Sequence, residues 1–171
     1  MAILKIVKWP EEILSRKTVQ VESVDDAVRR LLDDMAETMY ASNGIGLAAP
    51  QVGSSLRVAV IDVPADGDNP ATGLVCLVNP LVVSGDGTVS IDEGCLSFPG
   101  IEVPVKRSGH VVVEYLDRNG VPSRIEATDL AAICLQHEID HLDGITMIDR
   151  VGPIRRKLAI RDYQKAMHKV L

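Results

Sequence analysis

The chain has 171 residues, of which 46% are apolar and 25% are charged, and its formal net charge at pH 7 is −6. A length of roughly 100–200 residues is typical of one domain, and this composition excludes a disordered or fibrous protein. The acidic balance argues against a basic surface that recognises specific nucleic-acid sequences. We therefore expect a single domain over residues 1–171, with no sequence-specific nucleic-acid partner.

The N-terminal segment lacks the features of an export signal. Such a signal joins a basic start to an unbroken apolar stretch, whereas lysines and a proline interrupt the apolar residues at the start of this chain. No stretch approaches the about 20 apolar residues that span a bilayer. Cys76, Cys95 and Cys134 are an odd number of cysteines at wide spacing, which disfavours a disulfide framework. We expect a cytoplasmic protein without a membrane partner.

The first predicted element is an amphipathic helix. Ser23-Val24-Asp25-Asp26 has the pattern of a capping box, with Ser23 as the residue that starts the helix. Asn43-Gly44 would end it. The apolar residues at helical spacing between these points are Val28, Leu31, Leu32, Met35 and Met39. A glycine-rich loop is expected to follow at residues 44–53.

Residues 57–127 favour β structure. Runs rich in β-branched residues are separated by proline, glycine and aspartate; they lie at residues 57–61, 74–78, 81–83 and 110–115. Asn119-Gly120 is a turn signal that would join the last run to residues 121–126 as a hairpin. The polar segment at residues 66–70 is predicted to be a surface loop.

Two further helices are predicted after the strands. One begins at Thr128 or Asp129 and runs to Gly144. The other begins at Pro153, a favourable first helical position, and continues to the C-terminus with its lysines and arginines outside an apolar stripe. Helices that flank a strand-rich centre indicate an α+β fold.

The strongest chemical signal lies in the second of these three helices. His137 and His141 are four residues apart, so helix geometry places both rings on one face, where they can share a metal ion. Glu138 completes an H-E-x-x-H motif and is placed to act as a general base. Both histidines fall in line with Leu130 and Cys134, which predicts that they face inward.

Catalytic metal sites of this kind usually use three protein ligands and leave one position open. Cys95 is the candidate third ligand, because it follows Gly94 in a loop and offers a soft sulfur donor. Cys76 and Cys134 are interpreted as small buried side chains. Gln51, at the end of the glycine-rich segment, can donate a hydrogen bond to an oxyanion without adding charge.

Three segments of the chain, taken together, resemble the peptide deformylase family. They match its G-x-G-x-A-A-x-Q, E-G-C-L-S and Q-H-E-x-D-H signatures in that order, and the resemblance covers nearly the whole chain. It implies a mixed α+β domain whose mostly antiparallel strands surround a central helix with the H-E-x-x-H motif, plus an N-terminal and a C-terminal helix. It also implies a metal-dependent hydrolase that removes the N-formyl group from the N-terminal methionine of newly synthesised proteins and releases formate.

The resemblance assigns roles to individual residues. It implies that Cys95, His137 and His141 bind the metal, and that Glu138 acts as general base and acid. Gln51 and the backbone N–H of Leu96 would form the oxyanion hole. The residues that would contact the substrate are Ile45, Gly46, Ile133 and Cys134. The implied cofactor is Fe2+, with Zn2+, Ni2+ or Co2+ as substitutes, all of which suit a cysteine and two histidines.

Two charged positions add detail to the resemblance. The family pairs an arginine with the acidic residue between the histidines, which implies a contact between Arg107 and Asp140; two independent surface charges are the alternative. Glu102 departs from the pattern, because some bacterial relatives have arginine there, so the preference for residues after the methionine stays open.

The implied partners are N-formylmethionyl nascent peptides. Some relatives also dock on the ribosome through a C-terminal helix, so the basic face of the last helix is either a ribosome contact or a solvated surface. Two rival functions remain: a small zinc endopeptidase, suggested by the H-E-x-x-H motif alone, and a structural metal site in an interaction module, which would normally need a fourth ligand.

Overall fold

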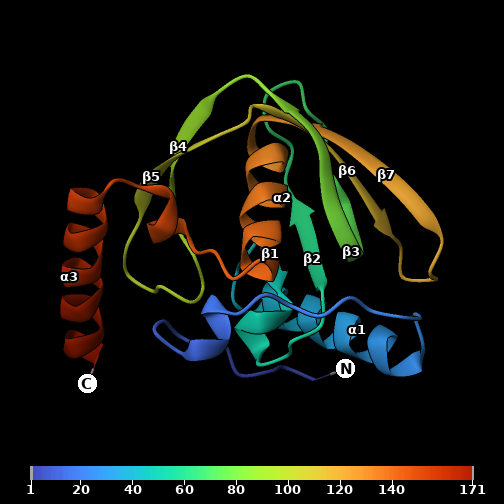
Figure 1. Cartoon of the computed structure of the whole chain (residues 1–171), viewed down its shortest axis with the longest axis horizontal. Coiled ribbons are helices and arrows are strands. Elements are labelled where there is room, and N and C mark those ends of the chain that lie inside the picture. Colours follow the sequence, from blue (N-terminus) through green and yellow to red (C-terminus); the bar gives the residue numbers. More distant parts are fainter. Residues whose placement is uncertain (1, 171) are drawn as a thin grey trace.

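The computed structural model describes residues 2–170, with Val170 described by its backbone alone (Figure 1). The helices are α1 (Asp26–Ala41), α2 (Asp129–Leu142) and α3 (Pro153–Val170). An antiparallel five-stranded sheet has the order β1-β2-β3-β6-β7, formed by β1 (Gly46–Ala48), β2 (Val58–Val63), β3 (Gly73–Asp86), β6 (His110–Leu116) and β7 (Pro122–Thr128). A separate antiparallel pair consists of β4 (Val89–Glu93) and β5 (Val103–Arg107). The expected α+β fold is confirmed.

Helix α2 lies at the centre of the molecule, between the five-stranded sheet and the β4–β5 pair (Figure 1). Its apolar side chains, among them Leu135 and Leu142, pack in one core with Ile61, Leu77 and Val113 of the sheet. The helix and the sheet therefore cover each other's apolar faces. This packing fixes the position of the motif that α2 carries, and it confirms that a central helix bears the H-E-x-x-H sequence.

Helix α1 covers one end of the sheet, and its first turn differs from the prediction. The helix is capped by Asp25, whose carboxylate accepts a hydrogen bond from the N–H of Val28 at 2.9 Å, so Ser23 does not start it. An aspartate at this position also complements the positive end of the helix dipole. The predicted apolar face is otherwise correct, since Val28, Leu32, Met35 and Met39 are buried.

Strand β3 corrects a second prediction. The runs at residues 74–78 and 81–83 belong to one strand, although Asn79-Pro80 separates them. The backbone of Asn79 has a positive φ of 52°, and the pairing with β6 shifts in register there. The Asn79 side chain exchanges two hydrogen bonds of 2.8 Å with the backbone of Val21. The strand thus passes the proline through a bulge, which such contacts stabilise.

Three short strands were not among the predicted elements. Gly46–Ala48 was expected to be part of a loop, but it forms β1 and pairs with β2, Gly46 lying opposite Ile61. Strands β4 and β5 are likewise additional, and Pro104 within β5 weakens its sequence signal. By contrast, the predicted hairpin appears as β6 and β7, and residues 66–70 form a turn closed by hydrogen bonds between Asp66 and Asn69.

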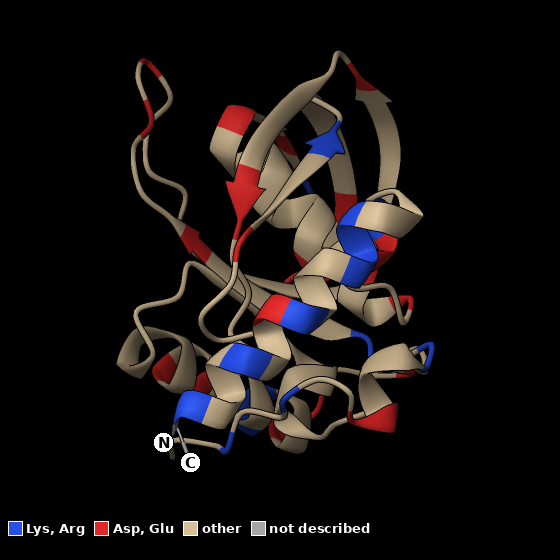
Figure 2. Cartoon of the chain, turned by 90° about the vertical axis from the view of Figure 1, so that its left-hand side faces the viewer, with Lys and Arg blue, Asp and Glu red and all other residues tan. Residues whose placement is uncertain are grey.

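Helix α3 packs against the segment that follows β4. Tyr163 meets Phe98 with ring centroids 5.4 Å apart, and Phe98 stacks on Trp9 at 5.8 Å. The Tyr163 hydroxyl donates to the carbonyl of Trp9 at 2.8 Å. The side of α3 that faces outward carries most of its lysines and arginines (Figure 2). The helix therefore has an apolar inner side and a basic outer side.

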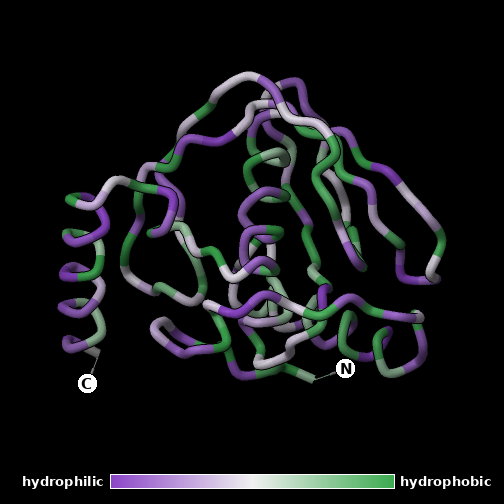
Figure 3. The backbone as a smooth tube through the Cα atoms, in the orientation of Figure 1, coloured by the Kyte–Doolittle hydropathy of each residue, from purple (hydrophilic) through white to green (hydrophobic). Residues whose placement is uncertain are grey.

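Along the backbone, apolar residues gather where the elements face one another (Figure 3). No helix within residues 2–170 is long and apolar enough to cross a membrane.

Candidate metal centre

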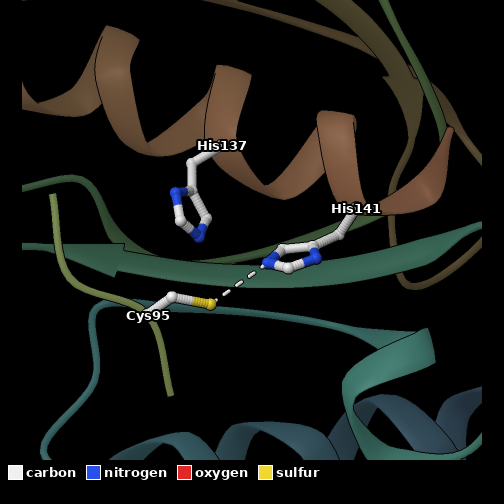
Figure 4. Close-up of side chains that lie close together, drawn as sticks. All are labelled: Cys95, His137 and His141. Atoms are coloured by element: carbon white, nitrogen blue, oxygen red, sulfur yellow. Dashed lines mark hydrogen bonds between the residues drawn. The ribbon is translucent and has the colours of Figure 1, made fainter. Parts of the chain in front are cut away.

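Three potential metal ligands converge from two parts of the chain. Helix α2 supplies His137 and His141, and the segment that follows β4 supplies Cys95 (Figure 4). Their ligand atoms all lie within 4.8 Å of one another. The Cys95 sulfur is 3.4 Å from Nε2 of His141. The helical spacing of the histidines thus does place both rings beside the cysteine.

The ring of His137 is oriented by a carboxylate. Its Nδ1 lies 2.9 Å from Oε1 of Glu93, the last residue of β4. A histidine that donates from Nδ1 has its lone pair on Nε2, which is the arrangement of a metal-bound ring with an outer hydrogen bond. The other nitrogen of His137 points toward the Cys95 sulfur (Figure 4).

Glu93 is itself held by a buried arginine. Arg107, at the end of β5, donates to both Glu93 oxygens, at 2.6 and 2.8 Å. It also donates to Oδ2 of Asp140 at 2.8 Å, so the expected contact between Arg107 and Asp140 is confirmed. Sequence reasoning missed Glu93. The signal available was its position directly before Gly94-Cys95.

The electrostatics of the two imidazoles favour a bound cation. Burial lowers the pKa of His141 well below its ordinary value, helped by the positive charges of His137 and Arg107, so this ring is neutral and can act as a ligand. Burial also lowers the pKa of His137, but Glu138, Cys95 and Glu93 outweigh burial and raise it well above its ordinary value. The same negative groups that favour a proton at His137 would favour a metal ion beside it.

Glu138 lies next to this cluster and is 4% exposed. Its Oε1 has no hydrogen-bond partner within residues 2–170. Burial raises the pKa of Glu138 to about 7, although His137 and Arg107 act in the opposite direction. A Cβ atom at Gly46 would lie 2.5 Å from Oε2 of Glu138 and 2.9 Å from the Cys134 sulfur, so a larger residue there would force these side chains to move.

Gln51 is buried on the other side of the sulfur. Its Oε1 accepts a hydrogen bond from the N–H of Ala48 at 3.0 Å. The amide nitrogen therefore faces Ser97, whose hydroxyl is 3.2 Å away, and the Cys95 sulfur at 3.5 Å. Leu96 follows Cys95 and lines a cavity beside the three potential ligands.

A cavity of about 430 Å³ opens beside the cluster. All four residues expected to contact a substrate line it: Ile45, Gly46, Ile133 and Cys134. Phe98 and Leu130 add to its apolar wall. Burial raises the pKa of Cys134 well above its ordinary value, so Cys134 stays a protonated thiol, which is a poor metal ligand.

The donor set fits a metal ion. One sulfur and two imidazole nitrogens suit zinc and the neighbouring divalent transition metals, and three protein ligands leave a coordination position free. Cys95, His137 and His141 are the one group of this kind found among the described residues. Nδ1 of His141 is buried and has no hydrogen-bond partner among the described residues. The His141 ring is therefore less firmly oriented than the ring of His137.

The remaining cysteine and a further histidine lie away from the cluster. Cys76 is half-buried in β3, and burial raises the pKa of its thiol, as expected for a packing residue. His110 lies on β6 between the carboxylates of Asp86 and Glu126, at 3.1 and 2.6 Å.

Comparisons with known proteins agree on one family. A family model described as polypeptide deformylase matches residues 3–157. The peptide deformylase of Thermodesulfovibrio yellowstonii is 48% identical over 158 residues, which make up 92% of this chain and 94% of that protein. The crystal structure of peptide deformylase from Ehrlichia chaffeensis gives a TM-score of 0.92 at 39% identity, with 98% of both chains covered. A crystal structure from the same organism in complex with actinonin gives 0.91 at 41% identity, covering 97% of this chain and 98% of that one.

Replacing Arg107 by methionine is expected to lower the free energy of unfolding by about 3–5 kcal/mol, because it leaves the buried carboxylates of Glu93 and Asp140 without their shared partner. Urea denaturation measures the loss. Arg118→Gln is the control: Arg118 pairs with Asp33 at the surface, and such pairs contribute at most about 1 kcal/mol. Equal losses in the two variants would contradict the prediction.

Proposed function

Because the chain belongs to the polypeptide deformylase family, we propose that Cys95, His137 and His141 hold the metal ion with which it hydrolyses the N-formyl group from N-terminal methionine. The convergence of these three ligand atoms within 4.8 Å, beside a buried carboxylate and an apolar cavity, supports the proposal most directly. The family function requires an amide bond to be cut by water, with formate as one product.

The ion proposed for this site is Fe2+, with Zn2+, Ni2+ or Co2+ as substitutes. A cysteine and two histidines suit all four by ligand chemistry, and the family resemblance favours iron. When bound, the ion would supply Lewis acidity toward the formyl oxygen and the attacking water. The chain's own contribution to this step is the set of three ligand atoms, with Glu93 fixing the proton of His137 on Nδ1.

Glu138 is the proposed general base and acid. It takes a proton from the attacking water and later gives it to the departing amine of the methionine. A pKa of about 7, raised by burial, suits a group that must accept and release a proton near neutral pH. Its Oε1 atom, which has no hydrogen-bond partner among residues 2–170, is available for this exchange.

The developing oxyanion would be held by the amide of Gln51 and the backbone N–H of Leu96. Because the Gln51 carbonyl oxygen is engaged by Ala48, its NH2 group is directed to the side of Cys95, where the formyl carbon would react. Such a preset donor needs no reorientation during the reaction, which is the main source of its effect.

The substrate would enter along β1 and place its methionine side chain in the apolar cavity. Strand β1 is at the edge of the sheet, so one side of its backbone is open to a substrate strand. Gly46 lets the substrate approach Glu138 closely, and Ile45, Ile133 and Cys134 would contact the methionine. The cavity volume of about 430 Å³ is within the usual range for small-ligand sites.

Formate release tests the function against its two rivals. The wild-type protein should release formate from formyl-Met-Ala-Ser and leave unformylated peptides and casein intact. Glu138→Gln should lower turnover by about 10²–10⁴-fold, the usual contribution of a general base, with metal content by elemental analysis unchanged. Cleavage of casein would support a zinc endopeptidase. Metal binding without any hydrolysis would support a structural site.

Replacing Gln51 by alanine should lower turnover by about 10²–10³-fold, as loss of one oxyanion donor does in comparable sites. The bound metal should remain, because the three ligands are unchanged. Ser97→Ala is a matched control, since it removes the hydroxyl that contacts the same amide. Unaltered turnover in Gln51→Ala would reject its role in holding the oxyanion.

The proposed setting is the cytoplasm, where one domain of residues 1–171 meets formylated nascent peptides. The exposed basic side of α3, with Arg155, Lys157, Arg161 and Lys165, supports a contact with ribosomal RNA near the peptide exit (Figure 2).

Co-sedimentation with ribosomes tests this contact. Changing the four basic residues to glutamine should abolish pelleting and leave formate release unchanged. Removal of α3 is a poorer test, because it would also expose the buried Phe98, which packs against Tyr163 of this helix. Because phosphate contacts weaken with salt, pelleting of the wild-type protein should also fall as salt rises. If the wild-type protein and the glutamine variant pelleted equally, the basic side of α3 would be a solvated surface and not a ribosome contact.

A further inference from the structure

Arg150 lies behind helix α2, on the side away from the substrate cavity. It ends a short 3-10 helix, η3 (Met147–Arg150), whose first two residues are buried. The side chain of Asp149 accepts a hydrogen bond from the N–H of Thr146 at 2.9 Å, which closes the start of η3. The backbone that carries Arg150 is therefore well fixed, although its side chain is 45% exposed.

The Arg150 guanidinium donates two hydrogen bonds to the carboxylate of Asp140. Its Nε donates to Oδ2 at 2.9 Å and its Nη2 donates to Oδ1 at 2.7 Å. Asp140 is the residue directly before the proposed ligand His141, and its side chain is 10% exposed. A two-point contact of this kind fixes the plane of the carboxylate as well as its position.

Asp140 connects Arg150 to the other proposed histidine ligand. Its Oδ2 also accepts from Arg107 at 2.8 Å. Arg107 holds both oxygens of Glu93, and Glu93 contacts Nδ1 of His137 at 2.9 Å. An unbroken series of charged contacts thus runs from the surface at Arg150 to the ring of His137.

Arg150 adds a second guanidinium to this series. Two carboxylates, of Glu93 and Asp140, face two guanidiniums, of Arg107 and Arg150. A cavity of about 480 Å³ on this side is lined by Arg107, Asp140 and Arg150, so water could reach Asp140 if the Arg150 side chain were removed. Asp140 would then have an oxygen free to turn toward water, and Arg107 would lose a fixed partner.

We infer that Arg150 is a positioning residue that steadies His137 through Asp140, Arg107 and Glu93 and thereby slows the loss of the metal ion. The inference rests on the proposal that His137 is a metal ligand. Outer partners of ligand histidines typically change metal affinity about 10–100-fold when removed. Arg150 acts through three further side chains, so we expect a smaller change, of about 3–10-fold.

The test measures metal release directly. The full-length protein is loaded with Co2+ and mixed with excess chelator, and the cobalt absorption bands are followed in time. Arg150→Gln should release cobalt about 3–10-fold faster than the wild-type protein, and its cobalt bands should shift. Arg150→Lys keeps the charge but not the two-point contact, so its rate should fall between the two.

Arg156→Gln is the matched control. Arg156 is 43% exposed and lies 3.6 Å from a carboxylate of Asp149, so it resembles Arg150 in exposure and pairing but has no link to His137. It should release cobalt at the wild-type rate. The inference would be overturned if Arg150→Gln released cobalt at the wild-type rate, or if both glutamine variants released it equally faster. Either result would leave the proposed ligand set intact. A wild-type protein that takes up no cobalt would reject the proposed ligand set, and the inference with it.

Discussion

Helix α2 is buried along most of its length, yet its buried residues include two histidines and two carboxylates. Placing charged groups in such surroundings costs several kcal/mol each unless they are paired. His137 and Asp140 meet this requirement through Glu93, Arg107 and Arg150. Oε1 of Glu138 and Nδ1 of His141, in contrast, have no partner in the described part of the chain. The helix thus carries electrostatically satisfied groups next to polar atoms that are left available for chemistry.

The same charged contacts determine where the sulfur lies. Cys95 lies in the loop between β4 and β5, a pair of strands that is not a part of the five-stranded sheet. Glu93, two residues before the cysteine, is attached to α2 through His137 directly and through Arg107 and Asp140. Packing of Phe98 against Tyr163 holds the segment from its other end. The metal cluster therefore depends on polar contacts on one flank and aromatic packing on the other.

The sequence predicted those parts of the structure that follow from local periodicity. The spacing of His137 and His141 gave a shared helical face, and the Asn119-Gly120 turn gave the β6–β7 hairpin. Strand β1 could not be predicted this way, because Gly46–Ala48 acquires its conformation by pairing with β2. The continuity of β3 through Asn79-Pro80 could not be predicted for a similar reason. The bulge at this point of the strand is stabilised by Val21, which is distant in the sequence.

The candidate site shows the same division. Local geometry paired the histidines, and the soft sulfur and loop position of Cys95, in agreement with the family resemblance, suggested the third ligand. Nothing in the sequence pointed to Arg150, whose contact with Asp140 arises from the path of the chain after α2.

The separation between a fixed carboxylate and a reactive one follows from helical geometry itself. Adjacent residues of an α-helix are rotated by about 100°, so residues two apart point in nearly opposite directions. Glu138 and Asp140 stand in this relation, and only Asp140 contacts Arg107 and Arg150. Had Glu138 received those guanidiniums, they would hold its pKa low and remove its capacity to carry a proton near neutral pH. One turn of helix can therefore hold a structural carboxylate and a reactive one because the backbone directs them to different surroundings.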